Sequence, residues 1–292
     1  MRTFLLAAFL CCSVLSAADR ITFVRPVQPG SHWKCRIRTT QSARYSFRLP
    51  GREDPVIRLH TVRADFAGHL TIRQVNAAGN PVRMDIRAER LAGTVDGKAV
   101  TGLPAGTELE AVLTGSRAEF RGATLRPEQL TLLRSLFPPA SETRLADLTG
   151  AERTLPKPGQ GWRPELKPYL DMLASRGVSL PASAFQSGIT YFGKDPAAGA
   201  ACRKFGLLIE TVRLADYDCR FRLTFWLAPE GPPVLMVREA KEVVLNVLRD
   251  NQPFAAGTRV ELISEDHTEQ ELLPAAKLPE KRSSNGWDAL LR

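Results

Sequence analysis

Trp33-Lys34-Cys35-Arg36-Ile37-Arg38 is the stretch that decides the fold class, because apolar and basic residues alternate along it. Successive side chains of a β-strand point to opposite faces, so the alternation predicts a strand buried on one face only. The same alternation recurs over residues 82–90. Residues 205–212 and 220–227 are rich in β-branched and aromatic residues and predict a hairpin. The chain is therefore predicted to be mainly β.

Four short sequence matches recur in the same order in two parts of the chain, and they predict an internal duplication. The last three matches are separated by 153, 152 and 151 residues and the first by 129, so the second copy is expected to hold an insertion. The shared residues serve turns and packing, which indicates a duplicated scaffold rather than a duplicated active centre. The matches are Pro29-Gly30-Ser31-His32-Trp33 with Pro158-Gly159-Gln160-Gly161-Trp162, Leu70-Thr71 with Leu223-Thr224, Gly79-Asn80-Pro81-Val82-Arg83-Met84 with Gly231-Pro232-Pro233-Val234-Leu235-Met236, and Ala105-Gly106-Thr107-Glu108-Leu109-Glu110 with Ala256-Gly257-Thr258-Arg259-Val260-Glu261.

Helices are predicted only between and within the copies. Residues 127–137 begin with proline at the first helical position, and residues 164–177 fall in the insertion. Residues 237–248 fit an amphipathic helix or a strand, and the matching part of the first copy favours a strand. The predicted organisation is a signal peptide at 1–18, a β repeat at 19–125, a linker with short helices at 126–188 that includes the start of the second repeat at 158–162, a second β repeat at 189–274, and a polar C-terminal tail at 275–292.

The N-terminus has the three parts of a secretory signal peptide: Arg2, an apolar run over residues 4–15, and the small residues Ser16-Ala17-Ala18. The apolar run is shorter than the roughly 20 residues that cross a bilayer, and no later stretch reaches that length. Leu10 before Cys11 does not fit a lipidation signal. The protein is therefore expected to be exported, either periplasmic or secreted, with no transmembrane segment after cleavage.

The chain is basic, with a net charge of +9, and export argues against nucleic acid as a partner. Arginines crowd the first copy, and several fall on the polar faces of predicted strands. These arginines either meet an anionic lipid or polysaccharide or form an ordinary solvated face beside acids such as Asp65 and Asp85, and the second alternative is favoured. The predicted basic patch consists of Arg36, Arg38, Arg58, Arg63, Arg73, Arg83 and Arg87.

Three cysteines follow the signal peptide, namely Cys35, Cys202 and Cys219. Outside the cytoplasm, one disulfide and one free thiol are expected. The predicted hairpin keeps Cys202 and Cys219 roughly 33 Å apart along the strand direction. A disulfide is therefore expected between Cys35 and either Cys202 or Cys219.

No catalytic, cofactor-binding or metal-binding residue is identified in the sequence. Ser31 and Lys34 have the spacing of penicillin-recognising enzymes, but they open a predicted strand and the partner motifs are missing. His60, Asp65 and His69 are too few convergent ligands for zinc.

Two further segments resemble ligand loops only superficially. The acidic run 265–271 lacks the spacing of a calcium loop and is expected to form a solvated turn. Residues 188–193 have phosphate-loop glycines, but Lys194 is followed by Asp195 instead of a hydroxyl residue.

The ordered Pro-Gly-x-x-Trp, Gly-x-Pro-Val and Ala-Gly-Thr elements resemble uncharacterised exported bacterial proteins with duplicated β-units. Those proteins are similar in outline to the half-barrel of periplasmic lipoprotein carriers such as LolA. The resemblance covers most of the chain after residue 18 and carries over no site residue. It implies two tandem copies of a curved antiparallel sheet unit, half-barrel-like and joined by a short helical linker, with an apolar groove for a lipid or acyl chain.

Three classes of function follow from these patterns. The leading expectation is an exported, non-enzymatic binding protein for an apolar or amphipathic, lipid-like ligand. The alternative is a cell-envelope scaffold that binds proteins through sheet edges or its basic face. The third is a hydrolase whose carboxylates converge from distant strands.

Overall fold

The computed structural model describes residues 20–25, 27–114, 117–140, 143–175, 178–212, 214, 217–247 and 258–274. The predicted signal peptide and the predicted polar tail lie outside the described residues. The described part is mainly β and has three α-helices and one 3-10 turn. The helices are α1 (Pro127–Leu136), α2 (Leu145–Thr149) and α3 (Lys167–Ser175), and the turn is η1 (Ala182–Ala184).

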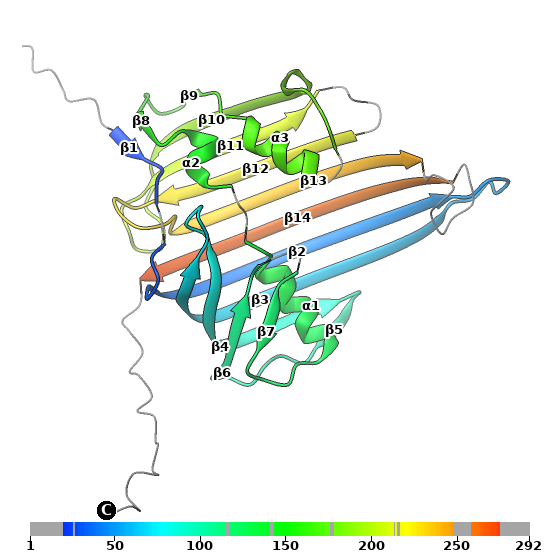
Figure 1. The fold of residues 1–292 in the computed structure, drawn as a ribbon, viewed down its shortest axis with the longest axis horizontal. Coiled ribbons are helices and arrows are strands. Elements are labelled where there is room, and N and C mark those ends of the chain that lie inside the picture. Colours follow the sequence, from blue (N-terminus) through cyan, green and yellow to red (C-terminus); the bar gives the residue numbers. More distant parts are fainter. Residues whose placement is uncertain are drawn as a thin grey trace, which may run out of the picture.

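One open antiparallel sheet dominates the molecule, and it twists and curves along its length (Figure 1). Its strand order is β7-β6-β4-β3-β2-β14-β13-β12-β11-β10-β9, and β5 pairs with β4 beside this path. A separate two-stranded sheet joins β1 to β8. The bounds are β1 Arg20–Thr22, β2 His32–Arg48, β3 Val56–Val75, β4 Pro81–Val95, β5 Lys98–Val100, β6 Thr107–Val112, β7 Glu119–Arg121, β8 Glu152–Thr154, β9 Gly161–Trp162, β10 Phe185–Lys194, β11 Arg203–Thr211, β12 Tyr217–Leu227, β13 Leu235–Val247 and β14 Arg259–Pro274.

The predicted repeats fall on neighbouring strands of the one sheet. The steady sequence separation matches β3 with β12, β4 with β13 and β6 with the start of β14, and the series β6-β4-β3 runs across the sheet in the same direction as β14-β13-β12. The two copies do not stay apart as two sheets. Instead β14 pairs with β2 along its whole length, so the last strand of the second copy joins the first strand of the first copy.

The Pro-Gly-x-x-Trp element forms the same backbone turn twice but docks on strands that are not equivalent. The Gly30 N–H donates to the Ile72 carbonyl of β3 at 2.8 Å, and the Gly159 N–H donates to the Tyr191 carbonyl of β10 at 2.7 Å. Both glycines have a φ of +85°, which L-residues rarely adopt. The insertion with α3 explains the difference, because it separates Trp162 from the rest of its copy by a helix and the extra strand β10.

The helices cover one face of the sheet, called the covered face here, and leave the opposite, open face to solvent (Figure 1). Helix α1 packs across β2, β3 and β4, and its Leu132 and Leu133 are completely buried. Because side chains alternate along a strand, β3 turns Val62, Ala64 and Phe66 toward this helix. The predicted helices at 127–137 and 164–177 are confirmed as α1 and α3, and residues 237–248 contain β13, as the repeat indicated.

The N-terminal segment belongs structurally to the second half of the molecule. Ile21 and Phe23 are buried in one cluster with Phe205 and Phe225, and the rings of Phe23 and Phe205 meet edge to face at 5.4 Å. Strand β1 pairs with β8 of the predicted linker. The predicted repeat boundary at residue 19 therefore differs from the packing boundary, because the chain crosses the molecule before β2 begins.

The expected disulfide of Cys35 with Cys202 or Cys219 is not formed, and all three residues are buried free thiols. Cys35 lies on β2 and Cys219 on β12, with β14 and β13 between them. Three strand spacings amount to about 14 Å, whereas disulfide Cα atoms lie within about 7 Å. Cys202 comes just before β11, one strand farther away. The predicted disulfide was wrong because β14 and β13 lie between Cys35 and the other two cysteines. The sequence did not reveal this strand order.

The acidic run 265–271 is the middle of β14, not the solvated turn that was expected. Its acids are divided between the two faces of the sheet. Glu265 and Glu269 are on the open face with basic neighbours, whereas Asp266 is on the covered face, where Gln41 and Arg238 donate hydrogen bonds to it. Cross-strand partners therefore allow an acidic stretch to remain a strand.

Candidate functional site

The open face of the sheet carries columns of opposite charge on neighbouring strands. Arg38 on β2 reaches Asp65 of β3 at 3.5 Å and Glu269 of β14 at 3.9 Å. Lys241 on β13 reaches Glu265 of β14 at 2.9 Å. These side chains are between about a quarter and just over a half exposed, so each pair contributes at most about 1 kcal/mol. The pairs set the charge pattern of the face more than its stability.

Most of the predicted basic patch is on this face, and much of it is neutralised. Cross-strand register places six of the seven arginines on the open face, and Arg58 on the covered face opposite Tyr45. Acidic partners are present for Arg36, Arg38, Arg73 and Arg83, namely Asp65, Glu269, Asp85 and Glu110. Among the described residues, no ion pair is formed by Arg58, Arg63 or Arg87.

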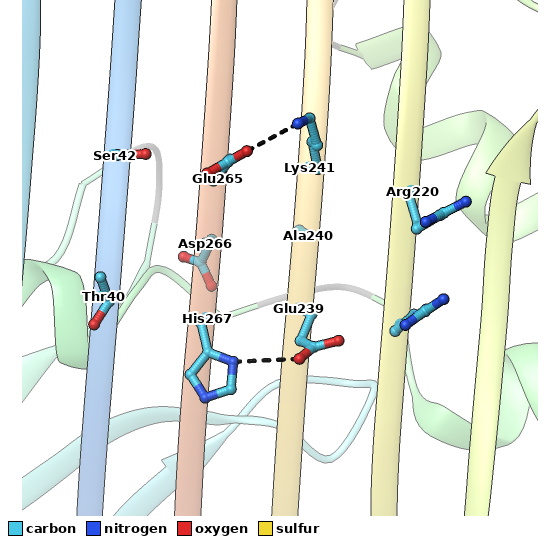
Figure 2. Close-up of a pocket in the computed structure, with 10 residues that line it drawn as sticks. Thr40, Ser42, Arg220, Glu239, Ala240, Lys241, Glu265, Asp266 and His267 are labelled. Atoms are coloured by element: carbon cyan, nitrogen blue, oxygen red, sulfur yellow. Dashed lines mark ion pairs between the residues drawn. The ribbon is translucent and has the colours of Figure 1, made fainter.

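A hollow lies across β2, β14, β13 and β12 at the centre of the sheet, and Figure 2 shows the residues that line it. The hollow measures about 320 Å³, and two ion pairs join charged side chains of its lining. Lys241 bonds Glu265, and the His267 Nδ1 atom lies 3.6 Å from Glu239 Oε1. The other lining residues are Thr40, Ser42, Arg220, Arg222, Ala240 and Asp266.

A second hollow of about 380 Å³ adjoins the first and shares Arg220 and Lys241 with it. Its remaining lining residues are Glu210, Thr211, Asp218 and Cys219. Both hollows are therefore lined mostly by charged and polar side chains, unlike the apolar groove that the family resemblance implied. Within the described ranges, no three His, Cys, Asp or Glu side chains are arranged to hold a metal ion.

The sequence candidates for chemistry are not brought together. His60 pairs with Asp96 at 2.9 Å, and His69 pairs with Glu89 at 3.1 Å. Register places His60 beside Ala43 on the covered face and His69 beside Lys34 on the open face. Asp65 is held by Arg36 and Arg38. In addition, Ser31 immediately precedes β2 and Lys34 lies in it, and residues 188–193 are part of β10.

The four central strands extend beyond the helices at one end, and this end is called the distal ribbon here. It comprises residues 43–48 of β2, 56–60 of β3, 243–245 of β13 and 259–263 of β14. Strand β4 pairs with β3 only from Val62 onward, and β12 pairs with β13 only as far as Val244. In Figure 1 these strands run past α1 and α3. Beyond Val244 the ribbon is therefore four strands wide, and residues 56–60 form one of its edges.

Apolar side chains are exposed on both faces of the distal ribbon. Ile57 is 50% exposed, Leu59 63% and Leu245 43%, and all three are on the open face. Tyr45 and Val56 are exposed on the covered face. These five residues are most of the eight large apolar side chains that are exposed in the described part of the chain. The rest of the open face is largely charged, so the ribbon is a distinct apolar surface.

Arginines surround the apolar side chains of the ribbon. Arg48 of β2 and Arg259 of β14 are directly opposite each other, although like charges in that position destabilise a strand pair. Arg44 is on the open face, Arg58 is on the covered face, and Arg52 lies in the connection between β2 and β3. No acidic side chain of the described residues forms an ion pair with any of these five. Free guanidinium groups are suited to binding phosphate or carboxylate groups.

The sequence contained a signal for this surface that alternation alone did not reveal. Tyr45 and Phe47 continue the pattern of an apolar residue at every second position of β2. Val56 and Ile57, in contrast, are adjacent apolar residues that must point to opposite faces. An apolar pair of this kind indicates either a strand buried on both faces or one with an exposed apolar side. Sequence alone could not decide which, because that depends on how far the helices reach.

No protein-family model matches the chain, and no curated protein sequence matches it. Among solved structures, lipovitellin, described for its lipid–protein interactions, is 10% identical with a TM-score of 0.29, over 86% of this chain and 26% of that one. The CymD monoaromatic hydrocarbon channel is 9% identical with a TM-score of 0.16, over 85% of this chain and 90% of that one. The present chain thus spans about a quarter of lipovitellin. At these scores neither likeness identifies a shared fold, and the resemblance to periplasmic lipoprotein carriers stays a prediction.

Among the helices of the described residues, none has the length and apolar character needed to cross a membrane.

Proposed function

We propose that this protein is an exported, non-enzymatic binding protein whose ligand is amphipathic and lipid-like. The observation that carries the proposal is the set of exposed apolar side chains on both faces of the distal ribbon. Full burial of one Leu or Ile side chain is worth about 1.5–3 kcal/mol, so a surface of this kind gains by covering Ile57, Leu59 and Leu245. The exposed apolar side chains support a ligand contact at the open end of the sheet rather than in an enclosed groove.

The arginines of the ribbon would bind the polar head group of the ligand. An acyl chain would cover Ile57 and Leu59, while an anionic head group would meet Arg44 on the neighbouring strand, opposite Leu59. Arginine binds phosphate and carboxylate groups through two parallel N–H donors. The combination favours an anionic amphiphile over a neutral hydrocarbon.

The outermost strands of the described sheet give little support to a scaffold that binds proteins by adding a strand to them. The outer strands are β7 with three residues and β9 with two. Very short edge strands are a known protection against pairing with another chain.

Native mass spectrometry of protein purified from its own envelope tests the proposal, followed by uptake of a fluorescent fatty acid in solution. We expect bound lipid in the wild type, and at least about tenfold weaker uptake by the I57S/L59S double variant. F192S is the matched control, because Phe192 is 52% exposed but lies on β10, away from the ribbon. Ligand-free protein that takes up no fatty acid would overturn the proposal.

A further inference from the structure

The distal ribbon has an unpaired strand edge on β3. Strand β4 pairs with β3 only from Val62 onward, and Asp96 closes the position before it. The Asp96 N–H donates to the Thr61 carbonyl at 2.8 Å, and the Thr61 N–H donates to Asp96 Oδ1 at 2.8 Å. Backbone groups alternate in direction along a strand, so the N–H and carbonyl groups of Ile57 and Leu59 point the same way as those of Thr61. In the part of the chain that the structure describes, no backbone hydrogen bond reaches these groups of Ile57 and Leu59.

This edge lacks the protection of the outermost strands. It is longer than β7 or β9, and its outward-facing residues Ile57 and Leu59 are 50% and 63% exposed. An exposed edge with apolar side chains is a template for a strand of another chain. The hydrogen-bond ladder of the sheet therefore can continue here into a second molecule.

The charges beside the edge identify which chain fits it. Glu53 and Asp54 come just before the edge and Arg58 lies within it, and none of the three forms an ion pair with another described residue. When two copies of one strand pair antiparallel, the start of each strand lies beside the later part of the other. A second copy of this chain therefore supplies both the missing strand and the opposite charge.

Symmetry restricts how the two strands align. In an antiparallel pair of identical strands the two-fold axis passes beside one residue, which lies opposite its own copy. The free edge allows Val56, Ile57 or Arg58 at that position. Arg58 at the axis would set two arginines directly opposite each other, and like charges there are destabilising. Val56 at the axis would set Ile57 opposite Pro55, which has no N–H, and Leu59 opposite the bend before Pro55. Ile57 is therefore the favoured position for the axis.

We propose that two copies of this chain form a dimer by antiparallel pairing of their β3 edges, with Ile57 of each copy opposite Ile57 of the other. The Ile57 N–H groups donate to the Ile57 carbonyls across the axis, and each Leu59 N–H donates to the Pro55 carbonyl of the other copy. On the covered face Arg58 lies diagonal to Asp54 of the other copy, within reach of a long side chain. The sheet then continues through both copies and both of its faces stay open. The pairing needs no lipid and goes beyond the proposed function.

Analytical ultracentrifugation of the lipid-free chain beginning at Asp19 tests the pairing. We expect a dimer that depends on concentration between about 1 and 200 µM, because the interface is smaller than that of tight complexes. Asp54→Arg or Arg58→Asp alone should raise the dissociation constant about tenfold or more, because symmetry makes each variant repulsive at two contacts. The double variant, and an equal mixture of the two single variants, should return to within about threefold of the wild type, because opposite charges meet again.

A cysteine at position 57 reports the register directly. Residues opposite each other in a hydrogen-bonded pair have Cα atoms about 5.5 Å apart, which suits a disulfide. Ile57→Cys should therefore cross-link two chains on mild oxidation. Leu245→Cys is the matched control, because Leu245 is 43% exposed on the same face of the ribbon but lies on β13, away from this edge.

Proline at the same position tests the backbone hydrogen bonds. Ile57→Pro removes an N–H that points away from β2, so the pairing of β2 with β3 is kept. It should weaken the dimer by about tenfold or more, whereas Ile57→Thr keeps the N–H and should weaken it less.

Two results would overturn the dimer. One is a chain that stays monomeric over the whole concentration range. The other is a dimer that ignores both the charge reversals and Ile57→Pro, since such a dimer forms elsewhere on the molecule. Fatty-acid uptake by a monomer would remove the pairing and keep the proposed function, whereas a dimer without uptake would do the reverse.

Discussion

At the residue scale, alternation in β2 determines which side chains are buried and which are solvated. Cys35 and Ile37 are 3% exposed, while Arg36 and Arg38 between them reach the acids of neighbouring strands. Burial also determines the chemistry of the thiol. Removal from water, with a smaller contribution from Glu89, raises the pKa of Cys35 to about 12. Burial likewise raises the pKa of Cys202 and of Cys219.

The thiols provide the first prediction. The folded chain beginning at Asp19 should react very slowly with a thiol reagent at pH 8, because the thiolate is the reactive form and burial disfavours it. After unfolding in guanidinium without reductant, three thiols should react, since all three cysteines are free. A colorimetric thiol titration measures both states. One reactive thiol after unfolding would show that a disulfide forms and would contradict the strand order.

At the element scale, α1 provides the largest apolar contact of a helix with the sheet. Leu132 is completely buried, and Phe137 at the end of the helix meets Phe66 of β3 edge to face at 5.2 Å. Gly93 on β4 lies directly under the helix, because an added Cβ would come within 2.9 Å of the Leu132 side chain. The helix and the strand are therefore fitted closely to each other. Beyond this contact the strands continue uncovered as the distal ribbon.

The contrast between covered and uncovered parts of the strands gives the second prediction. Leu132→Ala should lower the free energy of unfolding by about 2–5 kcal/mol, because it leaves a cavity between α1 and the sheet. Leu59→Ala removes the same atoms from a side chain that is 63% exposed, and it should change stability by no more than about 0.5 kcal/mol. Urea denaturation of the two variants measures the difference. Equal losses would mean that Leu59 is covered in the folded protein.

At the scale of the whole molecule, the pairing of β14 with β2 joins the two predicted repeats into one sheet. A hydrogen-bond network on the covered face crosses this junction. Asp266 of β14 accepts from Gln41 of β2 at 2.8 Å and from Arg238 of β13 at 2.9 Å. Thr39 and Thr268 are hydrogen-bonded across the same pair of strands at 3.0 Å. The network therefore ties the first copy to the second at the centre of the sheet.

Removal of this network gives the third prediction. Asp266→Ala should cost about 1–3 kcal/mol, because it leaves the partly buried Gln41 and Arg238 without their acceptor. Glu265→Ala, on the neighbouring residue but on the open face, should cost at most about 1 kcal/mol, because Glu265 is 56% exposed. Far-UV circular dichroism and tryptophan fluorescence should report one shared urea transition that moves in Asp266→Ala. Two separate transitions would contradict a single continuous sheet.

The sequence by itself determined the local structure of this protein. Alternation identified β2 and β4, proline marked the start of α1, and the repeated Pro-Gly turn was found in both copies, because each of these patterns depends on neighbouring residues only. The order of the strands depends on contacts between distant residues. Only the tertiary structure therefore placed β14 beside β2, kept Cys35 away from Cys202 and Cys219, and gave Asp266 its partners.

The candidate site shows the same division between local and distant causes. The sequence contains the apolar and arginine residues of the distal ribbon, but their exposure depends on where the helices end above the sheet. Helix α1 covers Phe66 and stops short of Leu59, although both residues belong to one strand. Burial of a side chain is a property of what packs against it. For that reason only the folded molecule separates a core position from an exposed apolar surface on the same strand.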